Sequence, residues 1–219
     1  MSQAVQTEKP AKSWSRRKQA RPGEILDAAL SVFAEKGYAA ARMEDIAARA
    51  GVTKGTIYLY FQSKEDVFKS LARLHVGDTL TNAAQQAAVF LGSVREFLGM
   101  FFAIIGEMIV NHGERAILPK IIIAESGNFP ELARFWRTEV IDKAIGMMSG
   151  IIRKGIASGE IRDLPPDYIA RLCAAPILMC IIWRTVIAPT DSVPFDYRKF
   201  LATHVDVLMN GLAPKERTS

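Results

Sequence analysis

The stretch that decides the fold covers residues 43–61 and reads MEDIAARAGVTKGTIYLYF. Apolar residues at helical spacing lie on both sides of Gly51, which can adopt the positive φ of a sharp turn. Thr53 follows the turn, and its hydroxyl is suited to cap the next helix. The pattern predicts two short helices joined by a tight turn, a helix-turn-helix, although an ordinary helical hairpin would give a similar pattern.

A helix-turn-helix indicates where DNA would bind, because its second helix enters the major groove with its first residues toward the bases. Lys54 can donate to guanine or to a phosphate, and Gly55 allows the backbone to approach. Lys64, at the start of the following helix, is placed to bind a phosphate, unless it is simply a solvated lysine. The ring of Tyr60 also fits the small core of the motif. The predicted groove-facing residues are Thr53, Lys54, Gly55, Thr56, Tyr58 and Tyr60.

Helical periodicity continues on both sides of the motif, and strand signals are nearly absent. An amphipathic helix is predicted from Pro22 to Lys36, and Gly37 ends it. Apolar helical segments follow one another after the motif. We expect an all-α protein with a disordered basic arm over residues 1–21, a three-helix DNA-binding domain over 22–68, and a larger helical domain over 69–219.

The formal net charge of +5 lies entirely within the first 22 residues. A basic arm on a neutral body is expected of a protein that meets a polyanion at one end, either nucleic acid or an anionic membrane. A solvated tail without a specific role is the alternative. The basic side chains, set against Glu8 alone, are Lys9, Lys12, Arg16, Arg17, Lys18 and Arg21.

Several classes of protein and site are not expected. The two longest apolar runs, 97–106 and 172–183, are shorter than the roughly 20 residues of a membrane-spanning helix. Residues 1–19 lack the apolar centre of a secretory signal, so we expect a cytoplasmic protein without a membrane span. Cys173 and Cys180 are expected to be reduced core residues. No histidine has metal-ligand spacing, and no cofactor, metal site or catalytic residue is predicted.

Five segments in and around the motif carry a common pattern: ILDAA at 25–29, FAEKGY at 33–38, DIA at 45–47, AGVTKGTIY at 50–58 and FQSKE at 61–65. Together they resemble the DNA-binding domain of the TetR/AcrR family of bacterial regulators. The resemblance implies a homodimeric transcription regulator, usually a repressor, which leaves its operator when a small molecule enters the larger domain.

Two positions depart from the family pattern. The family commonly has Thr or Ser just before the second helix, where this chain has Ala41 and Arg42. We expect Arg42 to replace that hydroxyl contact to the DNA backbone with a charged one, at the loss of a helix cap. Tyr60 stands where His is frequent, so the base preference cannot be transferred.

By the same resemblance, the last two helices, predicted at 166–187 and 195–212, would pair with those of a second copy. Two-fold pairing would place the two reading helices, which are the second helices of the two motifs, about 34 Å apart on a pseudo-palindromic operator. The expected seam comprises Ile177, Ile181, Leu201, Val205 and Leu208.

A small, largely apolar effector would need an adaptable apolar cavity in the larger domain. Large side chains on the middle helices are candidates for its lining, although ordinary core packing is the more frequent explanation for any one of them. The candidates are Phe101, Phe102, Ile105, Met108, Trp136, Met147, Ile151, Cys173, Ile177 and Trp183.

Three functions fit these features to different extents. An effector-released, DNA-binding repressor uses the motif, the basic arm and the apolar domain together. A DNA-binding protein without an effector would use only the first two. A helical enzyme or small-molecule carrier has the least support, because the chain has no Gly-rich phosphate loop, nucleophile elbow or metal cluster.

Overall fold

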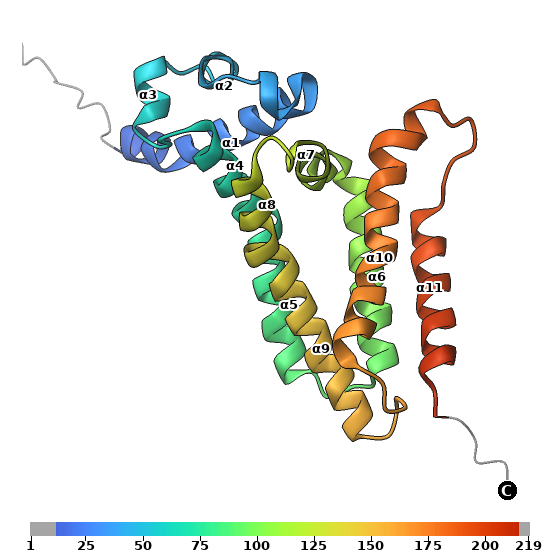
Figure 1. The fold of residues 1–219 in the computed structure, drawn as a ribbon. Helices are drawn as coiled ribbons and strands as arrows, with labels where there is room; N and C mark the ends of the chain where they lie inside the picture. Colours follow the sequence, from blue (N-terminus) through green and yellow to red (C-terminus); the bar gives the residue numbers. More distant parts are fainter. Residues whose placement is uncertain (1–11, 215–219) are drawn as a thin grey trace, which may run out of the picture. The chain divides into compact units, whose positions relative to one another are not determined.

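Helices make up all the regular structure that the described residues contain, as expected of an all-α protein (Figure 1). The computed structural model describes residues 12–214, with side chains described over 21–77, 79–113 and 115–214. The chain divides into two compact units, Met1–Phe68 and Lys69–Ser219.

The first unit is built from short helices around a long one. α1 begins at Lys12 rather than at the predicted Pro22, so it includes residues 12–21 of the predicted disordered arm. The good helix formers Lys, Arg, Gln and Ala dominate that segment and outweigh the donor that Pro22 removes. Residues 1–11 of the arm lie outside the described residues. The helices are α1 (Lys12–Ala40), α2 (Met43–Arg49), α3 (Lys54–Tyr58) and α4 (Lys64–Ala72), in which the unit boundary falls.

Three aromatic rings form the centre of the first unit. Phe33 and Phe68 are fully buried and Tyr38 is nearly so. The Tyr38 ring centroid lies 5.5 Å from that of Phe33 and 5.7 Å from that of Phe68. Gly37, at a φ of 74°, breaks the helical path of α1 as predicted and brings Tyr38 into this cluster. The long helix is therefore fastened to α4 by packed rings.

The second unit is a helical body whose core comes mainly from α6, α9, α10 and α11. α11 packs on α6, and α9 packs on both α10 and α5 (Figure 1). α6 begins with a capping box, in which the Ser93 N–H donates to Glu96 Oε2 at 2.8 Å. The elements are the π-helical turn η1 (Arg73–Gly77), α5 (Asp78–Val89), α6 (Val94–Asn111), the 3-10 turn η2 (Gly113–Ala116), α7 (Ile117–Glu125), α8 (Pro130–Trp136), the π-helical turn η3 (Arg137–Ile141), α9 (Asp142–Ala157), α10 (Pro166–Ile182), the π-helical turn η4 (Trp183–Ile187), the 3-10 turn η5 (Ala188–Thr190) and α11 (Tyr197–Leu212).

The helical path that starts with α10 continues through η4 and η5, and it is long and apolar enough to cross a membrane by length and composition, which the shorter apolar runs in the sequence did not predict. This finding does not test the expectation that the protein has no membrane span. Pro166–Thr190 spans 25 residues with a mean hydropathy of 1.8 over its apolar window. Arg171 and Arg184 bound the apolar run in the sequence but do not end the helix. Only 17% of the window is buried within the protomer. This helix therefore exposes apolar surface.

The predicted seam on the last helix is partly wrong. Leu201 and Val205 are 1% and 7% exposed, because this stripe of α11 faces the core beside α6. The exposed apolar side chains of the last two helices lie mostly on α10 instead. They are Tyr168, Leu172, Leu178 and Met179, with Val186 in η4 and Val207 on α11.

Gly155 marks a close approach between α9 and its neighbours. A Cβ built there would lie 2.5 Å from Val94 Cγ2, whereas one at Gly150 on the same helix would meet nothing within 4 Å. We expect Gly155→Ala to lower the free energy of unfolding by about 1–3 kcal/mol, because packed side chains must shift. Gly150→Ala is the matched control and should leave it unchanged or raise it by up to about 1 kcal/mol. Chemical denaturation at one protein concentration measures both, and equal stability of the two variants contradicts the packing described.

Candidate nucleic-acid interface

The turn between α2 and α3 has the geometry of a helix-turn-helix. Gly51 adopts a φ of 64°, and the Val52 N–H closes the turn by donating to the Ala47 carbonyl at 2.9 Å. Thr53 caps α3, since its Oγ1 accepts from the Thr56 N–H at 3.2 Å. The predicted turn and cap are therefore confirmed.

One face of α3 is buried and the rest is exposed. Ile57 is fully buried and Phe61, four residues later, is 5% exposed, so these two side chains attach the helix to its unit. Around that anchor the predicted groove-facing residues reach solvent. Thr53, Lys54, Gly55 and Tyr58 are exposed, and Thr56 and Tyr60 are half-buried.

Leu59, which the sequence analysis did not select, is 81% exposed beside these residues. The spacing of Ile57 and Phe61 could have indicated it, because two inward residues four apart leave the intervening positions outside. An exposed leucine can contact the methyl group of thymine.

Nothing within the described chain requires a glycine at position 55. A Cβ there would have Thr53 Oγ1 as its neighbour at 3.9 Å, an ordinary contact, and the φ of Gly55 is not positive. Alanine would favour the helix more than glycine does. The small residue therefore leaves room for something outside the protomer.

An ion pair joins the starts of α2 and α3. Lys54 Nζ lies 2.6 Å from Glu44 Oε1, with 65% and 50% of the two side chains exposed. The hydrogen bond from Lys54 holds the pKa of Glu44 below its ordinary value and raises the pKa of Lys54 in turn. Sequence reasoning missed this pair because its partners are ten residues apart on different helices.

Lys64 has a different setting from the predicted one. Its ammonium donates to the carbonyls of Tyr38, Ala39 and Ala41 at 2.6, 3.1 and 2.9 Å, and it lies 4.5 Å from the centroid of the Tyr38 ring. A cation near the C-terminal carbonyls of a helix is favourable. Lys64 thus fastens the end of α1 to the start of α4, and the predicted phosphate contact remains a prediction.

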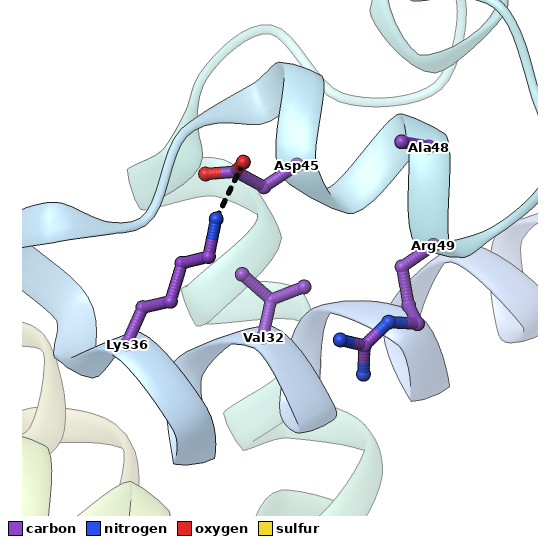
Figure 2. A pocket seen from close by; sticks show the side chains of 5 residues that line it. All are labelled: Val32, Lys36, Asp45, Ala48 and Arg49. Atoms are coloured by element: carbon purple, nitrogen blue, oxygen red, sulfur yellow. Dashed lines mark hydrogen bonds and ion pairs between the residues drawn. The ribbon is translucent and has the colours of Figure 1, made fainter.

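The start of α2 has no side-chain cap from Arg42, and a carboxylate of the helix instead binds the backbone in front of it. Asp45 Oδ2 accepts from the Arg42 N–H at 3.1 Å, and Asp45 Oδ1 pairs with Lys36 at 2.7 Å. Figure 2 shows this pair at a surface depression lined also by Val32, Ala48 and Arg49. The Arg42 side chain is exposed. The hydroxyl cap is therefore lost, as expected, because the Asp45 carboxylate accepts from the N–H of Arg42 and not from an N–H of the first helical turn, and Arg42 is left at the surface.

Eight of the ten predicted effector-binding residues lie in or beside the core cluster of the second unit, whereas Met108 and Trp136 do not belong to it. Phe102, Trp136, Ile151 and Cys173 are buried, and the other six are partly buried. Phe102 lines a cleft of about 320 Å³ between α6 and α11. Cys173 and Cys180 are free, and burial raises the pKa of the Cys173 thiol to about 12. The partly buried candidates are Phe101, Ile105, Met108, Met147, Ile177 and Trp183.

Comparison with known proteins places this geometry among bacterial regulators. A family model described as bacterial regulatory proteins, TetR family, matches residues 25–71. The fatty acid metabolism regulator protein of Bacillus subtilis (strain 168) is 32% identical over 148 residues, covering 67% of this chain and 74% of that protein. The HTH-type transcriptional repressor KstR2 of Mycolicibacterium smegmatis is 29% identical over 166 residues, covering 74% and 78%.

A solved structure shares the fold of both units. The crystal structure of the transcriptional regulator FadR from Bacillus subtilis in complex with stearoyl-CoA has a TM-score of 0.74 and 26% identity. The match covers 87% of this chain and 98% of that one.

Proposed function

This chain belongs to the TetR family of bacterial transcriptional regulators, and we propose that it is a repressor released from its operator by a long-chain acyl thioester. The observation that carries the proposal is the likeness to FadR of Bacillus subtilis, which holds over 98% of that chain in a complex with stearoyl-CoA. As a DNA-binding regulator it would act in the cytoplasm.

The operator would be read by the exposed residues of α3. Thr53, Thr56 and Tyr58 offer hydroxyls and apolar atoms to base edges, and Lys54 offers a charged donor. Gly55 allows close approach of the backbone. The exposed side chain of Arg42, which interacts electrostatically with Glu44 and Asp45, could also meet a phosphate. Lys64 could do so only by giving up a carbonyl that it now holds.

The second unit supports a large effector that is mostly apolar and carries a carbonyl group. Flexible Met and broad aromatic side chains lie among the aliphatic residues of its core and can repack around an apolar chain. Five buried side-chain polar atoms of the described residues have no hydrogen-bond partner, among them Ser149 Oγ and Trp183 Nε1. An unpaired buried donor is costly, so a carbonyl oxygen entering the core could satisfy one of them.

The apolar face of α10 supports a homodimer, which the family membership also implies. The exposed side chains of Leu172, Leu178 and Met179 would be covered by the same helix of a second copy. A helix this apolar and this little buried needs a partner surface in water. Two-fold pairing would then present two reading helices to the two halves of a pseudo-palindrome.

Selection from a pool of random duplexes, followed by displacement, tests the function. Wild-type protein should enrich a pseudo-palindrome, and stearoyl-CoA should release that duplex at concentrations where coenzyme A and acetyl-CoA do not. Fluorescence anisotropy of the labelled duplex measures the release. If no sequence is enriched, operator recognition is overturned. If the duplex is bound but no acyl-CoA of any chain length displaces it, only the proposed class of effector is overturned.

Leu172→Glu tests the dimer face. Two copies of a buried carboxylate would face each other across the seam, so the variant should sediment as a monomer where the wild type is a dimer. Its affinity for the selected duplex should fall by at least about tenfold, because each reading helix then binds alone. Val89→Glu on α5, where Val89 is 76% exposed, is the control and should change neither property. A dimeric Leu172→Glu variant would rule out this face.

A further inference from the structure

A carboxylate lies on the surface that the proposed function places against DNA. Glu44 lies in the first turn of α2, and its Oε1 lies 2.6 Å from Nζ of Lys54, the first residue of α3. DNA phosphates repel a carboxylate at this position, which lowers the affinity for every sequence unless the duplex offers a hydrogen-bond donor. A general attraction to DNA therefore does not explain why an acidic residue stands at position 44.

Three other cations of the first unit are held by groups within it. Lys36 pairs with Asp45 at 2.7 Å, and Arg49 binds Glu35 through two nitrogens at 2.6 and 2.8 Å. Lys64 donates to backbone carbonyls. These contacts fasten α1 to α2 and α4. The contact between Glu44 and Lys54 differs, because it lies at the entrance of the reading helix.

This pair is poised to exchange partners. Both side chains are at least half exposed, and ion pairs in that setting contribute little to stability, so the contact opens readily. When the ion pair is closed, the Lys54 ammonium is a donor and the Glu44 carboxylate is an acceptor beside it. The major-groove edge of a G·C pair presents the complement, with acceptors at guanine N7 and O6 and a donor at cytosine N4.

We propose that Glu44 and Lys54 together read one G·C base pair in each operator half-site, with Lys54 donating to guanine and Glu44 accepting from the cytosine N4 amino group. The inference rests on the proposed function, which places the exposed face of α3 on DNA. Glu44 is thus a specificity-determining residue.

The carboxylate of Glu44 opposes binding to DNA sequences that lack this G·C pair. On a DNA sequence without that G·C pair, Lys54 can still bind a phosphate. Glu44 then lies beside the polyanion, and no cytosine N4 amino group donates a hydrogen bond to it. Specificity built from such a repulsive element is common at selective interfaces. Glu44 lowers the affinity for other DNA more than it lowers the affinity for the operator.

The test uses full-length Glu44→Ala and Lys54→Met with single-base-pair variants of the duplex that the wild type selects. Asp27→Asn is the charge control, since Asp27 is an exposed acid of α1. The wild type should prefer G·C at one position of each half-site by about tenfold. Both variants should lose that preference at the same position, and Asp27→Asn should keep it.

Salt dependence gives a second readout for Glu44→Ala. Its affinity for a duplex lacking the operator should rise, and its log–log salt slope should steepen by about one unit, as Lys54 becomes free to bind a phosphate. Melting temperatures of all variants should match the wild type, because the exchanged side chains are exposed.

The outcomes separate this inference from the proposed function. If the wild type selects an operator and Glu44→Ala retains every base preference and the same salt slope, the inference is overturned and the function stands. If the two variants lose preference at different positions, the paired reading is overturned. A wild type that selects no sequence overturns the proposed function, and the inference with it.

Discussion

A helix of five residues cannot fix its own position on DNA, so α3 depends on the core beneath it. Ile57 and Phe61 hold α3 from below, and Thr53 caps its first turn. That core is fastened by the packing of Phe33, Tyr38 and Phe68 and by the ammonium of Lys64 on the carbonyls that end α1. In the proposed function, recognition would then be left to the exposed side chains of this short helix.

The second unit meets two demands with apolar residues. Its core must be filled without an effector and still be able to repack around one, which flexible and aromatic side chains allow. In the proposed dimer its α10 would also offer an apolar face to a second copy, which would explain why a helix of membrane-spanning length and hydropathy is so little buried within one protomer. A two-fold dimer links both demands to the operator, because it sets the distance between the reading helices.

The sequence predicted what is decided locally. The turn at Gly51, the cap at Thr53 and the exposed face of α3 follow from residues a few positions apart. Contacts between distant residues were missed: the Lys64 ammonium reaches a carbonyl 26 positions away, and Glu44 pairs across two helices. Periodicity showed that α11 has an apolar stripe, yet it could not say whether Leu201 and Val205 face α6 or a second copy. The extent of α1 before Pro22 depended on helix propensity outweighing one proline.

The central claim is that the exposed face of α3 touches the bases, and the operator affinity of Gly55→Ala tests it most directly. The added methyl group meets nothing closer than 3.9 Å within the described chain, so the free protein should melt at or slightly above the wild-type temperature. On DNA the same methyl group should clash with the duplex and weaken operator binding by about tenfold. A Gly55→Ala protein that binds the operator as tightly as the wild type would contradict the account.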